Sequence, residues 1–310
     1  MARPLRIEYA GAFYHVLNRG LERRDIFRNS RDYENFLSLL EDMRHKYQLV
    51  AHAYSLIPNH YHLFLETPQG QLSVIMRHID GVYTQRYNKK YNRAGPLFQG
   101  RYKAILVEKE AYSLELSRYI HLNPLKAGLV RNPEDWLWSS YKNFINRKPP
   151  PEFLNPHWLL SQFGTTSETA KKNFIQFTWE GLKQNWDPFK NLKKGSILGE
   201  DSFVAWVQQN HIKNKIDPEI PHLKKFKKAP SGEEITAVVR GLIAQESLQQ
   251  KFLIYALKNF SGLKLKEIGE KLGGIKYSAI STTIKRLEGL AQKDPHIKAL
   301  LKQLEEKCEM

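Results

Sequence analysis

Residues 56–66 read L-I-P-N-H-Y-H-L-F-L-E and decide the fold of the first half of the chain. The run is rich in Tyr, Leu and Phe and is led in by Pro58-Asn59, which predicts a β-strand with side chains alternating between two faces. His60 and His62 are two residues apart, so both imidazoles project from the same face. A His-x-His pair in a strand is more often structural than metal-binding, but two neutral imidazoles on one rigid face make two thirds of a metal site.

The segments on either side of this stretch predict alternating strands and helices. Residues 49–57 and 60–66 are separated only by Pro-Asn and should pair as an antiparallel hairpin. Further strands are expected at 11–18 and 97–107, and helices from a Ser30 cap to about Tyr47, at 73–90, and at 109–122 before Asn123-Pro124. The resulting order, β-α-β-β-α-β and one more helix, predicts an α+β catalytic domain of the ferredoxin-like split βαβ type, with an antiparallel sheet.

The helix expected at 109–122 carries a second group of polar residues. Tyr119 and Asn123 are four residues apart and therefore share one helix face. If that face packs toward His60 and His62, the Asn123 amide oxygen completes a metal site and a phenol is held beside it. His15 and His121 are left out of the predicted site, His15 as a sheet residue near the cleft and His121 because it points away from Tyr119.

The charge of the chain indicates its partner. The 310 residues include 48 Lys and Arg against 32 Asp and Glu, which leaves a net charge of +16. Such an excess favours a polyanion, with nucleic acid as the first candidate and an anionic membrane surface as the alternative. Because we find no long apolar run and no signal peptide, we expect a cytoplasmic protein associated with the bacterial nucleoid, with no membrane partner. A lone cysteine, Cys308, excludes a disulfide framework within one chain.

Three segments are expected along the chain. Residues 1–147 would be the catalytic domain, 148–230 a helical extension and basic linker, and 231–310 an all-α domain opened by a Ser231 cap. The linker ends in a basic run just before Pro230-Ser231-Gly232, formed by Lys224, Lys225, Lys227 and Lys228. Such a run is typical of a solvated linker that could also rest on phosphates.

The last segment contains a pattern of two helices joined by glycines. Leu265, Ile268 and Leu272 predict a short helix, Gly273-Gly274 a turn, and residues 280, 284 and 287 the buried face of a second helix. This spacing predicts a helix-turn-helix, with a helical bundle bearing a solvated basic face as the alternative. The second helix would present these candidate DNA-binding residues: Lys276, Tyr277, Ser278, Ser281, Thr282 and Lys285.

Four strings resemble the single-strand DNA transposases of the HUH tyrosine class, and within that class the REP-associated tyrosine transposases. They are F-Y-H-V-L-N-R-G from Phe13, I-P-N-H-Y-H-L-F-L from Ile57, L-F-Q-G-R-Y-K from Leu97 and R-Y-I-H-L-N-P-L-K-A-G-L-V from Arg118. The segment with W-L-L-S-Q-F-G from Trp158 is similar to a helical extension of that group. Residues 231–310 resemble the DNA-binding domain of the replication initiator DnaA, although Ile275-Lys276-Tyr277 replaces its Arg-Asp-His.

The resemblance implies a chemistry for these residues. Tyr119 would be the nucleophile that forms a 5′-phosphotyrosine, with His60, His62 and Asn123 as ligands of Mg²⁺ or Mn²⁺. Arg19 and Arg101 lie in two of the matching strings and are candidate DNA-binding residues. The implied enzyme is a metal-dependent DNA endonuclease and transposase that acts on single-stranded or hairpin DNA, as a monomer or a homodimer.

Two other functions remain open. One is a sequence-specific DNA-binding regulator derived from a transposase, which the initiator-like tail favours. The other is a replication-initiator nickase of the same HUH chemistry, against which the lack of a G-x-x-x-x-G-K-[ST] motif weighs. A covalent adduct between protein and DNA would separate the regulator from the enzyme.

Overall fold

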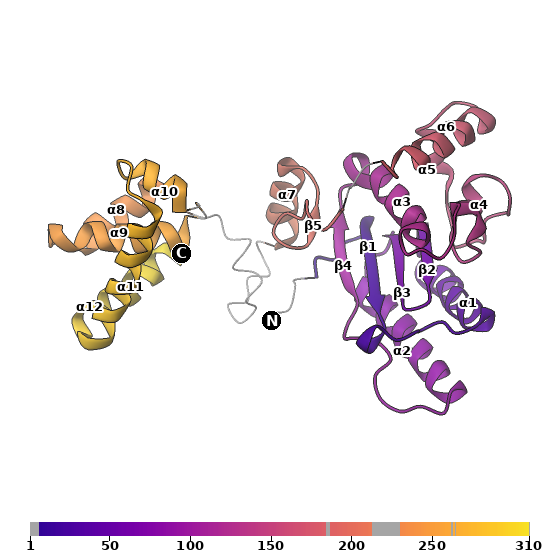
Figure 1. Cartoon of the computed structure of the whole chain (residues 1–310), viewed down its shortest axis with the longest axis horizontal. Coiled ribbons are helices and arrows are strands. Elements are labelled where there is room, and N and C mark those ends of the chain that lie inside the picture. The colour runs from indigo at the N-terminus through magenta and orange to yellow at the C-terminus, as the bar shows by residue number, and fades with distance from the viewer. Residues whose placement is uncertain (1–5, 184–186, 213–229, 262, 264, 310) are drawn as a thin grey trace. The chain divides into compact units, whose positions relative to one another are not determined.

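The computed structural model describes residues 6–183, 187–212, 230–261, 263 and 265–309 (Figure 1). The chain divides into two compact units, residues 1–225 and 226–310. The basic run at 224–228 lies outside the described residues. Among the helices that the structure describes, none is long and apolar enough to cross a membrane.

The first unit is built on a five-stranded sheet with the strand order β2-β3-β1-β4-β5. Its strands are β1 (Ala12–Arg19), β2 (Val50–Ile57), β3 (His60–Thr67), β4 (Lys103–Val107) and β5 (Ile197–Leu198). β2 and β3 form the predicted hairpin around Pro58-Asn59, and the β1 to β4 pairings are antiparallel. β3 lies between β1 and β2, which is the interleaving that the predicted β-α-β-β-α-β order requires.

The sheet is mixed, so the prediction of an antiparallel sheet is wrong. β5 pairs with β4 in parallel, with Leu106 opposite Ile197 and Val107 opposite Leu198. This strand comes from the segment that was expected to be only helical. Its two residues, Ile197 and Leu198, are fully buried, and they cover the edge that β4 would otherwise expose.

Helices pack on both faces of the sheet. α1 (Ser30–Tyr47) and α2 (Leu72–Lys90) lie on the face to which Tyr61 points, since Tyr61 contacts Phe36 of α1 and Asp80 of α2. α3 (Lys109–Lys126) lies on the opposite face, against β2 and β3. Leu116 and Ile120 of α3 are fully buried there in a cluster with Phe64 and Phe174.

Two predicted boundaries differ from the structure. The strand expected at 97–107 begins only at Lys103, because Gly100 adopts a φ of +146° and only Phe98 forms a bridge before it. α3 continues to Lys126 with Pro124 inside, since the proline removes a single backbone donor and Ala127 N still donates to Asn123 O at 2.9 Å. Asn123 is therefore a helical residue.

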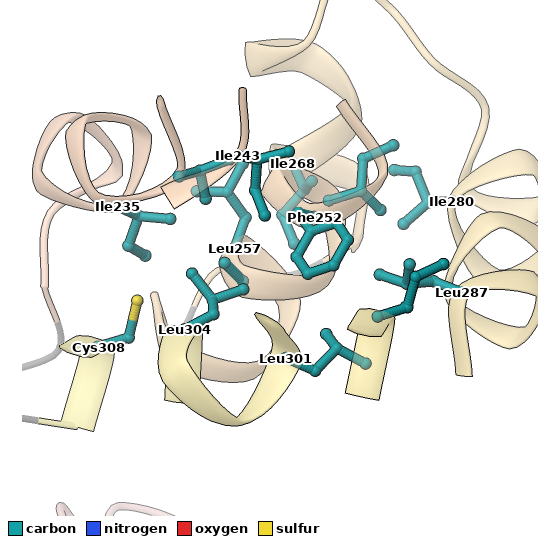
Figure 2. Packing of buried hydrophobic residues seen from close by; sticks show 14 residues of the cluster. Ile235, Ile243, Phe252, Leu257, Ile268, Ile280, Leu287, Leu301, Leu304 and Cys308 are labelled. Atoms are coloured by element: carbon teal, nitrogen blue, oxygen red, sulfur yellow. The ribbon is translucent and has the colours of Figure 1, made fainter. Parts of the chain in front are cut away.

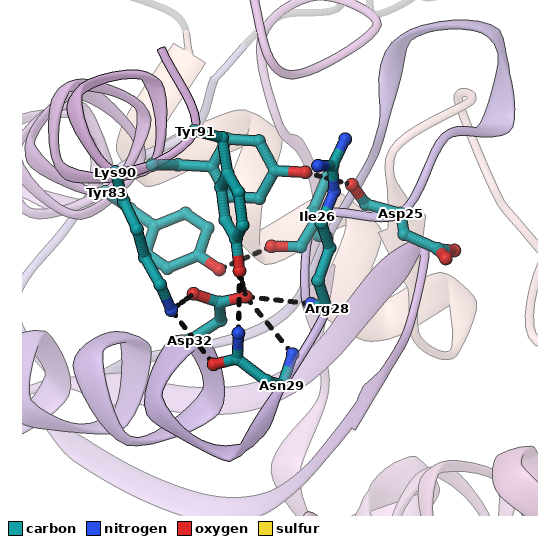
Figure 3. A network of polar contacts seen from close by, with 9 residues as sticks. Asp25, Ile26, Arg28, Asn29, Asp32, Tyr83, Lys90 and Tyr91 are labelled. Atoms are coloured by element: carbon teal, nitrogen blue, oxygen red, sulfur yellow. Dashed lines mark hydrogen bonds and ion pairs between the residues drawn. The ribbon is translucent and has the colours of Figure 1, made fainter. Parts of the chain in front are cut away.

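The capping residue of α1 is Asn29 rather than the predicted Ser30, which is the first helical residue. The Asp32 carboxylate accepts hydrogen bonds from Arg28 N at 2.8 Å and Tyr91 Oη at 2.7 Å, and it pairs with Lys90 Nζ at 2.6 Å (Figure 3). These bonds lower the pKa of Asp32 against the effect of burial, which raises it. The network joins the start of α1 to the end of α2.

The extension packs onto the catalytic domain within the first unit. Its elements are α5 (His157–Ser161), α6 (Ser167–Glu180), β5 and α7 (Asp201–Val207). α4 (Tyr141–Phe144) lies just before the extension, and short 3-10 turns lie earlier at Leu21–Arg23 and Pro133–Asp135. Arg118 of α3 is buried against α6, where its guanidinium donates to Phe177 O at 3.3 Å and lies over the Phe177 ring. A side chain at Gly181 would collide with Arg118, which explains the glycine there.

The second unit is helical, as predicted. It contains α8 (Gly232–Leu242), α9 (Glu246–Phe260), α10 (Leu265–Lys271), α11 (Tyr277–Lys293) and α12 (Pro295–Glu309). Ser231 caps α8, with its hydroxyl accepting from Glu234 N at 3.2 Å. The helices share one apolar core that includes Phe252, Ile268, Ile280 and Leu287 (Figure 2).

Glycines shape the turn between α10 and α11. Gly273 and Gly274 have φ values of +81° and +86°, a region that side chains other than glycine rarely adopt. Gly269 of α10 lies so close to the turn that a Cβ there would meet Ile275 O at 2.3 Å. The predicted turn at Gly273-Gly274 is therefore confirmed.

Candidate active site

The two histidines of β3 and the polar face of α3 meet, which is the packing on which the expected metal site depended. His62 is buried and its Nε2 accepts a hydrogen bond from Asn123 Nδ2 at 3.2 Å. Asn123 also forms a hydrogen bond with His60, which acts to raise the pKa of His60. The rings of His60 and His62 lie with their centroids 5.0 Å apart. The side chains of His60, His62 and Asn123 therefore lie together in one cluster.

Neighbouring groups fix the tautomer of each histidine. His60 Nδ1 donates to Asn59 Oδ1 at 2.7 Å, so the proton of the neutral His60 ring is on Nδ1. Because His62 Nε2 accepts from Asn123, the His62 ring proton is on Nδ1 and is donated to His15 Nε2 at 2.9 Å. The Nδ1 atom of each ligand candidate is thus held by a second group, as in metal-binding histidines.

Burial keeps these imidazoles neutral. It lowers the pKa of His60 to about 4 and the pKa of His15 to about 3, and it places the pKa of His62 well below its usual value. A neutral imidazole is the form that binds a metal ion. The donor set, two nitrogens with an amide that carries an oxygen, fits a divalent ion of the Mn²⁺ or Mg²⁺ kind.

Tyr119 lies beside this cluster. Its ring is half-buried, with its centroid 5.5 Å from that of His62 and 6.0 Å from that of His15. Burial, together with the negative charge of Asp187, raises the pKa of Tyr119 to about 12. The phenol is therefore protonated at neutral pH. Lys126 Nζ, on the same helix, lies 5.7 Å from the centroid of the Tyr119 ring.

His15 is the residue that the sequence argument left out and that the structure places in the site. It is fully buried on β1 and contacts both His62 and Tyr119. The pairing of Leu17 with His62 in the register of β1 and β3 puts His15 next to this face, and that pairing was not visible in the sequence. His121, also left out, points elsewhere as expected, with its Nε2 2.7 Å from Ser140 Oγ.

The two arginines proposed for DNA binding are exposed at one end of the sheet. Arg19, the last residue of β1, donates through Nη2 to Gln99 Oε1 at 2.9 Å and pairs in register with His60. Arg101 lies in the loop before β4. Gln99 N donates to Arg19 O at 2.8 Å, so this loop is joined to the strand end beside His60.

The residues proposed for DNA binding on α11 lie in the second unit. The exposed ones are Lys276, Ser278, Thr282 and Lys285. Ser281 is half-buried, and the Tyr277 side chain lies outside the described residues. Among the predicted buried positions, Ile280 and Leu287 are fully buried and Ile284 is partly buried.

Comparison with known proteins finds a family similar to the part of the chain that holds the site. The family model described as "Transposase IS200 like" matches residues 9–123, a range that contains His60, His62, Tyr119 and Asn123. Residues 9–123 are thus similar to an IS200-like transposase domain. A Haemophilus influenzae protein named as a REP-associated tyrosine transposase is 26% identical over 134 residues, which cover 39% of this chain and 76% of that protein.

Two solved structures are similar over part of the chain. One is a REP-associated tyrosine transposase bound to a REP hairpin, 19% identical, covering 49% of this chain and 89% of that one with a TM-score of 0.41. The other, described as a transposase of Deinococcus radiodurans, is also 19% identical and covers 39% and 94% with a TM-score of 0.28.

The buried neutral histidines make the first unit sensitive to acid. Burial lowers the pKa of His121 to about 3, as it does that of His15, so between pH 6.5 and 3 the unfolded chain binds protons that the folded chain does not. The free energy of unfolding therefore decreases as the pH is lowered through this window, by about 1.4 kcal/mol per pH unit for each such group.

We expect the melting temperature, followed by tryptophan fluorescence without metal, to fall steadily from pH 6.5 to 4. All six tryptophans lie between residues 136 and 206, so the signal reports the first unit. His121→Gln should flatten this dependence, whereas the same change at the exposed His157 should leave it as in the wild type. If the melting temperature fell equally steeply with decreasing pH in both variants, buried neutral His121 would not be a source of the acid sensitivity.

Proposed function

We propose that this chain is a metal-dependent endonuclease and strand transferase for single-stranded or hairpin DNA. The observation that carries the proposal is the convergence of His60, His62 and Asn123 beside Tyr119 within an IS200-like transposase domain. A gel under denaturing conditions tests it directly, because the reaction leaves the protein covalently attached to one DNA fragment.

The reaction follows from the residue types. The Tyr119 Oη attacks the scissile phosphorus, the bond from phosphorus to the 3′-oxygen breaks, and the strand is held as a 5′-phosphotyrosine. The 3′-oxygen takes up a proton and leaves as a hydroxyl, and a later attack by a 3′-hydroxyl restores both the tyrosine and a phosphodiester. The bond energy is conserved, so strand transfer needs no nucleotide cofactor.

His60, His62 and Asn123 would hold Mg²⁺ or Mn²⁺. Such an ion, when bound, supplies Lewis-acid stabilisation of charge on the phosphate and on the leaving oxygen. The residues of the chain do the rest: α3 holds the Tyr119 ring against His62 and His15, and Lys126 adds positive charge on the same helix. With a pKa near 12, Tyr119 must lose its proton as the phosphate approaches.

Exposed basic groups provide a path for the strand. Arg19 and Arg101 lie at the end of the sheet that carries His60, and the whole chain has a net charge of +16. Phosphate contacts of this kind give affinity without sequence preference. The similarity to a REP-associated tyrosine transposase supports a palindromic repeat, folded as a hairpin, as the natural substrate.

For the second unit we propose a helix-turn-helix that binds duplex DNA, in the manner of the initiator domain it resembles. The support is the glycine turn between α10 and α11 and the exposed Lys276, Ser278, Thr282 and Lys285. The separate apolar core of this unit supports independent folding. If the first unit formed no adduct with DNA, duplex binding by the second unit would favour a DNA-binding regulator as the function of the chain.

Deleting residues 231–310 should spare cleavage of a short single-stranded oligonucleotide and weaken binding to long duplex DNA. The reason is that unpaired DNA is needed at Tyr119, whereas a helix-turn-helix inserts into the major groove of a duplex. The measurement is a duplex titration at several salt concentrations with the full-length and the truncated protein.

Point variants refine this experiment. Lys276→Ala and Lys285→Ala should each reduce the slope of log affinity against log salt by about one unit. Lys298→Ala, an exposed lysine on α12, is the matched control and should keep the slope. If truncation left duplex affinity unchanged at every salt concentration, the second unit would be a packing or partner module.

A further inference from the structure

A turn of the extension places an exposed aromatic ring beside the catalytic cluster, by which we mean His15, His60, His62, Tyr119 and Asn123. In residues 187–190, Asp187 Oδ1 accepts a hydrogen bond from Phe189 N at 2.9 Å, and Lys190 N donates to Asp187 O at 3.1 Å. Pro188 is buried, whereas the Phe189 side chain is 36% exposed. The turn therefore holds its backbone in one conformation while presenting the ring to solvent.

The ring of Phe189 contacts the active site. Its centroid is 5.9 Å from that of His15, and the His15 ring is 6.0 Å from that of Tyr119. The negative charge of Asp187, two residues earlier, adds to the effect of burial in raising the pKa of Tyr119. The turn is tied to the sheet shortly afterwards, because Lys193 N donates to Ile197 O at 2.8 Å and Ile197 belongs to β5.

This exposure distinguishes Phe189 from the rest of the described surface. Of the large hydrophobic side chains exposed there, Phe189 is the one whose ring contacts a residue of the catalytic cluster. Trp206, the other exposed aromatic among them, packs instead on Tyr9 and His211. An exposed aromatic face beside a nucleophile, followed by the exposed Lys190, offers what a nucleotide binds: a stacking surface and a cation for its phosphate.

We propose that Phe189 stacks on the base of a nucleotide that flanks the scissile phosphate and so holds the strand in register with Tyr119. The inference rests on the proposed endonuclease function and adds a substrate contact to it. Stacking tolerates every base, because each has a π-face, so Phe189 positions the strand without selecting a sequence. The alternative, that the turn covers the site and excludes DNA, predicts the opposite effect of removing the ring.

The test uses full-length protein and an oligonucleotide that the wild type cleaves at a mapped phosphate. 2-Aminopurine is placed in turn at the two nucleotides that flank this phosphate, and its fluorescence is followed in the Tyr119→Phe background, which keeps the strand intact. We expect quenching at one of the two positions. Phe189→Leu, which keeps apolar bulk, and Phe189→Ala should both abolish this quenching and weaken binding roughly tenfold.

Two further variants complete the design. Phe189→Trp should retain the quenching, since it keeps an aromatic face, and Trp206→Leu should leave quenching and affinity unchanged as the matched control. Undiminished quenching in Phe189→Leu and Phe189→Ala, or tighter binding by them, would overturn the inference. If the wild type forms no adduct with any single strand, the proposed function is wrong and the inference falls with it. If the wild type forms the adduct but the Phe189 variants keep the quenching and affinity of the wild type, only the inference is wrong.

Discussion

Replacing Tyr119 by phenylalanine should abolish the covalent adduct and reduce strand cleavage by about a thousandfold or more. The change removes only the hydroxyl, and the ring keeps its contacts with His62 and His15. Binding of single-stranded DNA should therefore stay within a few fold of the wild type. The measurement is a denaturing gel of a labelled oligonucleotide, paired with an affinity titration of the same strand.

Tyr112 provides the matched control on the same helix. It is half-buried, and its hydroxyl donates to Glu200 Oε1 at 3.1 Å, away from the histidines. Tyr112→Phe should form adduct at the rate of the wild type. An adduct of undiminished yield from Tyr119→Phe would mean that another residue attacks the phosphate.

The second large effect concerns the metal ligands. His60→Ala and His62→Ala should each lose cleavage and lower the affinity for Mn²⁺ by roughly a hundredfold or more, since removing even a group that supports a ligand costs 10 to 100-fold. With only three protein ligands available, the loss of one leaves a poor site. Calorimetric titration of Mn²⁺ into each variant gives the affinity independently of the reaction.

Graded variants sharpen this test. His15→Ala keeps both ligands and removes the hydrogen-bond partner of His62, so it should weaken Mn²⁺ binding by less than either ligand variant. His157→Ala, an exposed histidine on α5, should change nothing. Cleavage that continues in excess chelator would remove the metal from this account, whatever the variants do.

The geometry of the strand that carries His60 and His62 could be predicted from the sequence, but not all of the site could. Proline and asparagine between two apolar runs determine the hairpin, and a period of two places His60 and His62 on one face. The four-residue spacing of Tyr119 and Asn123 likewise determines their common face. These are local relations along one strand or one helix, and for this reason they could be predicted.

What could not be predicted depends on contacts between distant segments. His15 reaches the site only through the register of β1 against β3, and Phe189 only because β5 joins the sheet in parallel with β4. A two-residue strand such as Ile197–Leu198 leaves no periodic signal to detect. The strand predicted from residue 97 begins only at Lys103, and the reason is local: Gly100 adopts a backbone conformation that interrupts the strand.

The central claim is that Tyr119 is the nucleophile, and mapping the adduct tests it most directly. After incubation with a single-stranded oligonucleotide and Mn²⁺, the protein is digested with nuclease and with trypsin, and the peptide that retains a nucleotide is identified by mass spectrometry. Cleavage after Arg118 and Lys126 gives Y-I-H-L-N-P-L-K, in which Tyr119 is the only tyrosine, whereas Tyr112 falls in the preceding peptide. We predict a phosphonucleotide on Tyr119; the same mass on any other peptide would contradict the account.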